Sequence, residues 1–157
     1  MFKKFGIVAL GCALATTPLG TKQMIIDDFK NKLINSSWDP ETLELGIRAR
    51  FKCEYCGCNF FSSTNNYDSI QRDHLIPIMA GGTDTFNNLV LSCKTCNFIK
   101  RNWHPSSDLI RISNREELLS LAKEYVLKKR KVKETKMEKE KKLAILLLEA
   151  IENTQII

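Results

Sequence analysis

The chain has 157 residues, of which 43% are hydrophobic and 27% are charged. At roughly 100 to 200 residues per domain, this length accommodates one compact domain with extensions and excludes a large multidomain protein, and the composition excludes wholesale disorder and a polytopic membrane protein. The 24 Lys and Arg residues against 18 Asp and Glu residues give a formal charge of +6, which favours a polyanionic partner such as nucleic acid without proving one.

The first fifteen residues combine a basic start with an apolar stretch. Residues 5–15 are mostly apolar and end in Ala13-Leu14-Ala15, which has the small-x-small form of a signal-peptidase site. One interpretation is a cleaved export signal, and the other is a short apolar element that packs on the domain. The chain offers no segment of the roughly 18 to 20 apolar residues that a membrane-spanning helix needs, so stable membrane insertion is not expected.

Residues 16–47 are predicted to form a helical N-terminal extension. Apolar residues recur at helical spacing between residues 25 and 34. A second helix is expected to begin at Asp39-Pro40, because the Asp side chain can cap the first turn and Pro lacks only an N–H that has no partner there. This helix leads into the first pair of cysteines.

The spacing of the cysteines indicates a metal site. Of the six cysteines, four form Cys53-x-x-Cys56 and Cys93-x-x-Cys96, and a tetrahedral zinc ion is bound by two such pairs. Gly57 supports the first turn because it can adopt a positive φ. We therefore expect structural zinc rather than disulfides, with Cys58 as a free thiol beside the site; the lesser alternative for Cys58 is a regulatory or alternative-ligand role. Because zinc–thiolate sites are more often kept in reducing compartments, we expect a cytoplasmic protein, with export as the alternative.

The segment between the cysteine pairs is predicted to contain two strands and to continue into a helix. Residues 59–67 are rich in Ser, Thr and Asn and indicate a loop, whereas residues 69–76 alternate as in a strand. Gly81-Gly82 turns the chain, residues 89–91 form a short apolar strand, and residues 94–103 can form a helix that stops before Pro105. The predicted fold class is α+β.

Residues 105–157 are predicted to form a helical, basic C-terminal extension. Its main helix is expected to begin at Ser113 or Asn114, because Glu116 and Glu117 lie three residues further on. Residues 122–142 contain ten Lys or Arg and four Glu, which suits either a solvated helix face or a phosphate-binding arm. Residues 143–151 are apolar nearly all round and indicate packing or self-association.

Several spaced motifs resemble the HNH endonuclease family in its four-cysteine form. They are Asp73-His74-Leu75-Ile76-Pro77, Gly81-Gly82, Asn88-Leu89 and Cys93-x-x-Cys96-Asn97 with Lys100, within residues 51–101. The resemblance implies a ββα-metal finger over residues 48–104, stapled by a four-cysteine zinc site and flanked by helices. It also implies DNA as the substrate and Mg²⁺ or Mn²⁺ as the catalytic ion.

The resemblance assigns roles to four of these residues. His74 would be the general base, Asp73 and Asn97 would bind the catalytic ion, and Asn88 would brace the loop and orient the base. Phosphodiester hydrolysis does require a base and a cation. Because neighbours on a strand point to opposite faces, joint use of Asp73 and His74 predicts a local distortion where the strand ends or bulges. Asn at the last position, where the family pattern has His, suits a hard cation such as Mg²⁺.

Less specific interpretations stand beside this one. Lys100 and Arg101 would contact phosphate or be solvated helix charges, and His104 is expected at a helix end or on the surface. Each of the four site residues could separately be a strand end, a packed histidine, a turn or a cap. The alternative function is a non-catalytic zinc-finger DNA-binding protein. A homodimer would be the simplest way to cut both strands.

Overall fold

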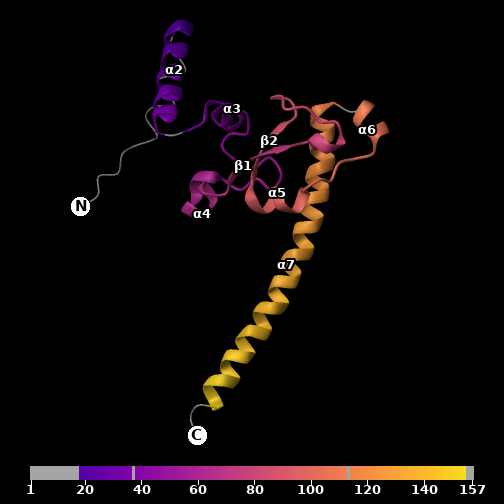
Figure 1. Cartoon of the computed structure of the whole chain (residues 1–157). Coiled ribbons are helices and arrows are strands. Elements are labelled where there is room, and N and C mark those ends of the chain that lie inside the picture. Colours follow the sequence, from indigo (N-terminus) through magenta and orange to yellow (C-terminus); the bar gives the residue numbers. More distant parts are fainter. Residues whose placement is uncertain (1–17, 37, 113, 155–157) are drawn as a thin grey trace, which may run out of the picture. The chain divides into compact units, whose positions relative to one another are not determined.

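The computed structural model describes residues 18–36, 38–112 and 114–154 (Figure 1). Residues 1–15, for which the sequence allowed an export signal or a packed element, lie outside the described residues. The chain divides into two compact units, Met1–Glu44 and Leu45–Ile157. Among the described residues no helix is both long and apolar enough to cross a bilayer.

The first unit contains helix α2 (Leu19–Asn35) and the start of helix α3 (Pro40–Arg48). The start of α3 confirms the prediction from Asp39-Pro40. Asp39 Oδ2 accepts hydrogen bonds from the backbone N–H of Thr42 at 2.9 Å and from its hydroxyl at 2.7 Å. This side-chain cap satisfies one of the N–H groups that the first turn leaves without a helical partner.

The second unit is built on a two-stranded antiparallel sheet of β1 (Ile70–His74) and β2 (Leu89–Cys93). Asp73 pairs with Val90 and His74 pairs with Leu89, so no bulge interrupts the register. The local distortion expected at Asp73 and His74 is thus only the end of the strand, which falls at His74. Asp73 is buried and His74 is partly exposed, as the alternation of side chains along a strand requires.

Short helices surround this sheet. The segment expected to be a loop contains η1 (Phe60–Ser62) and α4 (Thr64–Tyr67). Its polar residues cap these turns: Asn59 Oδ1 accepts from the N–H of Phe61 at 2.9 Å, and Ser63 Oγ accepts from that of Asn66 at 3.2 Å. η2 (Ile78–Ala80) lies in the connection between the strands, and α5 (Lys94–Lys100) follows β2. Strand, strand and helix follow one another as predicted, and the α+β class is confirmed.

The C-terminal part consists of α6 (Ser107–Ile112) and the 40-residue helix α7 (Arg115–Thr154), which is orange to yellow in Figure 1. The predicted start of α7 is confirmed by a reciprocal cap. Asn114 Oδ1 accepts from the N–H of Glu117, and Glu117 Oε2 accepts from the N–H of Asn114, both at 3.0 Å. α7 packs against α5, and its buried residues lie in its first half.

The core of the second unit lies around the sheet. All five residues of β2 are buried, which is unusual for a strand in a two-stranded sheet and requires cover on both faces. That cover includes apolar side chains of the cysteine-bearing segment and of α7. The fully buried members are Tyr55, Phe60, Ala122 and Val126.

Candidate functional site

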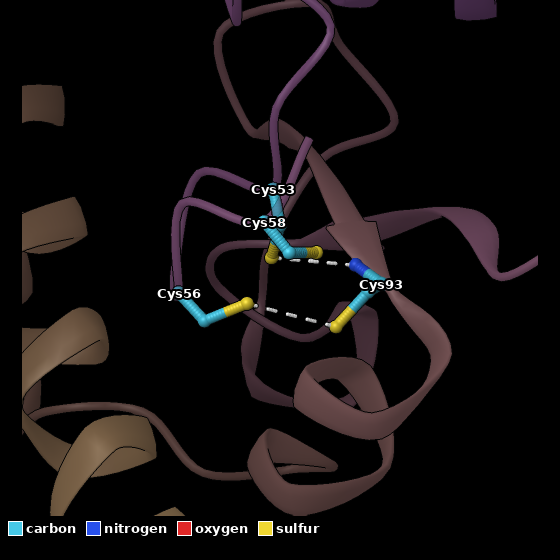
Figure 2. Close-up of side chains that lie close together, drawn as sticks. All are labelled: Cys53, Cys56, Cys58 and Cys93. Atoms are coloured by element: carbon cyan, nitrogen blue, oxygen red, sulfur yellow. Dashed lines mark hydrogen bonds between the residues drawn. The ribbon is translucent and has the colours of Figure 1, made fainter. Parts of the chain in front are cut away.

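Four cysteine sulfurs lie within 4.8 Å of one another at one end of the sheet, those of Cys53, Cys56, Cys58 and Cys93 (Figure 2). The Sγ atoms of Cys56 and Cys93 are 3.9 Å apart. A tetrahedron with zinc–sulfur bonds of about 2.3 Å has an edge of about 3.8 Å. The sulfur arrangement therefore fits a structural metal ion such as zinc.

A tight turn presents the first two of these sulfurs. Gly57 has a φ of 75°, and its N–H donates to the carbonyl of Cys53 at 2.8 Å. The N–H of Cys53 then donates to the carbonyl of Cys58 at 3.0 Å, so the chain folds back on itself. The positive φ expected of Gly57 is confirmed. The same reversal brings Cys58 to the sulfur cluster.

Neighbouring thiols and burial shift the pKa values in this cluster in opposite directions. A hydrogen bond with Cys53 lowers the pKa of Cys93 to about 6, whereas burial raises the pKa of Cys58 to about 12. Hydrogen bonding with Cys56 raises the pKa of Cys53 above its usual value. A thiolate, which is the form that binds metal, is thus stabilised by the thiols around it.

Cys96, which the spacing predicts as the fourth ligand, is buried on α5 beside this group. Hydrogen bonding with Cys53 is the main reason that its pKa is raised, with further contributions from Cys56 and Cys93. Its Sγ also lies 3.5 Å from Arg130 Nη1 of α7. Among the described residues, the group of sulfurs within 4.8 Å of one another thus contains Cys58 and not Cys96, whose pKa nevertheless responds to the same thiols. The sequence favoured a free thiol at Cys58 and allowed an alternative-ligand role for it only as the lesser interpretation.

A second group of predicted residues meets at a surface hollow of about 270 Å³. His74 and Asp73 reach it from the end of β1, Asn97 from α5, and Arg101 from the residue after α5. The end of the strand and one face of the helix thus bring these side chains together. The other lining residues are Pro77, Ile78, Met79 and Asn102.

The imidazole of His74 is held by an acidic residue of the loop between the strands. Its Nε2 lies 2.9 Å from Asp84 Oδ1, and the His74 side chain is one-third exposed. Sequence reasoning missed Asp84, although an acidic residue two positions after the Gly81-Gly82 turn was a signal that could have been used. A carboxylate on one ring nitrogen fixes which nitrogen carries the proton and which can act as a base.

Asp73 is buried and already has two partners. Its Oδ2 accepts a hydrogen bond from the Tyr55 hydroxyl at 2.7 Å and lies 3.4 Å from Lys100 Nζ. Burial raises the pKa of Asp73, and the Lys100 charge opposes this shift. Burial lowers the pKa of Lys100, and Asp73 in turn opposes that shift. Tyr55, Asp73 and Lys100 thus form a buried polar network beneath His74.

This network corrects the expectation for Lys100. Its side chain is 0% exposed, and Nζ donates to the backbone carbonyl of His74 at 2.7 Å. A side chain enclosed in this way cannot contact a phosphate group on the surface. Lys100 instead supports the end of β1 and compensates the charge of Asp73.

The Asn88 side chain forms hydrogen bonds with both ends of the loop that follows β1. Its Oδ1 accepts from the N–H of Ile76 at 2.9 Å, and its Nδ2 donates to the carbonyls of Ile76 and Thr83 at 2.9 and 2.8 Å. Gly82 packs closely against these hydrogen bonds. A Cβ at this position would come within 1.9 Å of the Ile76 carbonyl oxygen. The conformation of the loop therefore depends on both residues.

Two arginines form hydrogen bonds with the last residues of this loop. Arg48 of α3 donates to the carbonyl of Phe86 at 2.8 Å, and Arg115 of α7 donates to that of Asn87 at 3.0 Å. Both also bind the nearly buried carboxylate of Glu54, at 3.1 and 2.8 Å. The loop that carries Asp84 is thus attached to two helices far apart in the sequence.

The residues on α5 differ in how they are held. Asn97 Nδ2 donates to Gln71 Oε1 at 2.8 Å, which leaves Oδ1 as the atom that could bind a cation. Arg101 has a φ of 46°, a backbone conformation that costs energy outside glycine, and its guanidinium lies 4.1 Å from the Phe98 ring centroid. His104 Nδ1 lies 2.7 Å from the Pro105 carbonyl oxygen.

Comparisons with known proteins agree with this description. The sequence model of the HNH endonuclease family matches residues 53–102, which contain both cysteine pairs, β1, β2 and α5. No curated protein matches the chain, and no solved structure matches it. The family is one of nucleases and DNA-binding proteins, which implies a nucleic-acid substrate. With its four-cysteine cluster and its small mixed fold, the segment of residues 53–102 thus matches the HNH endonuclease family in sequence and in architecture.

Proposed function

We propose that this protein is a metal-dependent endonuclease that hydrolyses DNA phosphodiester bonds with His74 as the general base. The observation that carries the proposal is the meeting of His74, Asp73, Asn97 and Arg101 at one exposed hollow of a domain whose sequence is that of a nuclease family. A base, two oxygen donors for a cation and a cationic group for phosphate are what this hydrolysis requires.

The contact with Asp84 supports His74 as a base. When Nε2–H donates to the Asp84 carboxylate, the lone pair of the neutral ring lies on Nδ1. Nδ1 is then the atom that accepts a proton from the attacking water, and Asp84 stabilises the imidazolium that results. The backbone of His74 is held at the same time by Lys100. Asn88 maintains the loop that carries Asp84.

The donor atoms available in the hollow suit a hard cation. Asp73 Oδ2 is occupied by Tyr55 and Lys100, so Oδ1 of Asp73 and Oδ1 of Asn97 are the atoms that would hold Mg²⁺ or Mn²⁺, which prefer oxygen ligands. When bound, the ion would neutralise charge on the phosphate and on the departing oxygen. Arg101 would bind a phosphate oxygen, and the zinc held by Cys53, Cys56, Cys93 and Cys96 would serve the fold only.

One observation favours the alternative, a non-catalytic zinc-finger DNA-binding protein. Lys100 Nζ lies 3.4 Å from Asp73 Oδ2, so a positive charge already compensates the carboxylate that should bind the catalytic ion. In that case the hollow would bind phosphate without cleaving it. The two functions differ in whether His74 is needed.

The test is conversion of supercoiled plasmid by the zinc-loaded protein in the presence of Mg²⁺ or Mn²⁺. We expect nicking or linearisation that His74→Ala abolishes while DNA binding persists. His104→Ala is the matched control, because this histidine is engaged with the Pro105 carbonyl, and it should cleave like the unchanged protein. Binding without metal-dependent conversion by the unchanged protein would exclude the nuclease and favour the DNA-binding alternative.

We also propose that the protein acts in the cytoplasm. The thiols clustered around Cys53 must stay reduced to bind zinc. Intact-mass measurement of protein from its native cell tests this, because loss of residues 1–15 would indicate export instead. A homodimer would supply one site per DNA strand, and light scattering of the protein on DNA would show it.

A further inference from the structure

A basic surface with an exposed aromatic ring extends from the His74 hollow along α5 to α7. A second hollow of about 460 Å³ shares Asn97, Arg101 and Asn102 with the first. Its remaining lining residues are Gln71, Lys94 and Phe98. Every side chain around it is neutral or basic. The two hollows are therefore one continuous surface without an acidic group on the α5 side.

Phe98 connects this surface to α7. Its side chain is 57% exposed, with Arg101 Cζ 4.1 Å and Lys133 Nζ 5.6 Å from the ring centroid. Cations at these distances from an aromatic ring are attracted to it. Phe98 thus holds a cation from the active-site hollow and a cation from α7 at the same exposed ring.

The next turn of α7 continues the basic surface. Lys129 lies four residues before Lys133, on the same helix face, and its Nζ is 5.8 Å from the Tyr125 ring centroid. Tyr125 in turn stacks on Trp103, with ring centroids 4.4 Å apart. This stack anchors the helix to the domain at the point where Lys129 begins the basic surface.

Ion pairs and hydrogen bonds of neighbouring cations limit the extent of this basic surface. Arg130 turns inward and binds Glu134 and Cys96, and Lys136 pairs with Glu140. These cations are partly neutralised, whereas Lys129 and Lys133 face aromatic rings. The cations of this surface that lie at its hollow and its aromatic rings are Lys94 and Arg101 in the hollow, Lys133 at the Phe98 ring and Lys129 at the Tyr125 ring.

From this geometry we infer that Lys129 and Lys133 of α7 bind backbone phosphates of the DNA that flanks the scissile bond, with Phe98 holding Lys133 toward the His74 hollow. The inference rests on the proposed function and extends the DNA contact beyond the matched domain. According to this inference, only the first half of α7 binds DNA.

Salt-dependent DNA binding separates this role from that of a solvated helix face. Each phosphate contact contributes about 0.9 to the slope of log affinity against log salt concentration on duplex DNA. For a fluorescein-labelled duplex without Mg²⁺, Lys129→Gln with Lys133→Gln should lower the magnitude of the slope by about 1.8. The matched control is Lys141→Gln with Lys142→Gln, which removes the same charge from the same helix and should leave the slope nearly unchanged.

The same slope in the double variant and the control would overturn the inference, even if the unchanged protein cleaves plasmid. Conversely, loss of slope in the Lys129 and Lys133 variant of a protein that never cleaves would support this surface and reject the nuclease. Both variants lie on exposed positions of α7, and circular dichroism together with zinc content verifies that each is folded.

Discussion

Replacing Asn88 with alanine should destabilise the domain around residues 53–102 by about 3 to 4.5 kcal/mol. The buried amide makes three hydrogen bonds of 2.8 to 2.9 Å, two of them to Ile76 and one to Thr83. A net contribution of about 0.5 to 1.5 kcal/mol for each gives roughly 1.5 to 4.5 kcal/mol. Alanine also leaves the Ile76 N–H and carbonyl without these partners, which places the expected loss in the upper part of that range.

Urea unfolding of the zinc-loaded protein measures this loss. Trp103 packs on the core and stacks on Tyr125, so its fluorescence reports on the domain. Trp38 belongs to the other compact unit, and both proteins should therefore carry Trp38→Phe. Asn88→Asp should be at least as destabilising as alanine, because a carboxylate would turn an acceptor toward the carbonyls of Ile76 and Thr83.

Asn87→Ala is the matched control, since Asn87 is the exposed neighbour and the same atoms are removed. Its loss should stay below about 0.5 kcal/mol, as for other surface substitutions. Equal losses for Asn88→Ala and Asn87→Ala would refute the reasoning, because the three bonds would then contribute nothing beyond the change of residue type.

Three further substitutions test other parts of the domain. Cys96→Ser should lower the zinc content measured by native mass spectrometry, whereas Cys58→Ser should retain one zinc per chain; the reverse pattern would make Cys58 the fourth ligand. Lys100→Met should lower the free energy of unfolding by about 3 kcal/mol, because it leaves the Asp73 carboxylate buried without a cation. Adding Asp73→Asn should recover part of this stability in urea unfolding. An unchanged loss in the double variant would contradict the ion pair. Gly82→Ala should lower the urea midpoint because its Cβ would come within 1.9 Å of a carbonyl oxygen, and Gly20→Ala, which has open space, is the control that should not.

Local signals in the sequence predicted local structure well. The Asp39 cap, the reciprocal cap of Asn114 and Glu117, and the turn at Gly57 each depend on residues within four positions of one another. Such interactions form wherever the right residue types stand at the right spacing. The order of the strands and α5, and the two cysteine pairs, could be predicted for the same reason.

The environment of individual side chains could not be predicted in this way. The sequence placed Lys100 on the surface with Arg101, yet it is buried against Asp73, 27 positions earlier. The sequence favoured a free thiol at Cys58 over an alternative ligand, yet it lies in the sulfur cluster with Cys93. In both cases the deciding contact is with a residue from a distant part of the chain.

By itself the sequence determined the small α+β fold of the segment that matches the HNH family and the two cysteine pairs that suit a metal ion, because residue type and spacing suffice for turns, caps and paired cysteines. Only the tertiary structure decided that Asp84 holds His74, that Asp73 is compensated by Lys100, and that Arg48 and Arg115 meet at Glu54. The physical reason is that charge compensation and burial arise from contacts between residues up to 61 positions apart. Those contacts exist only once the sheet and its surrounding helices have packed.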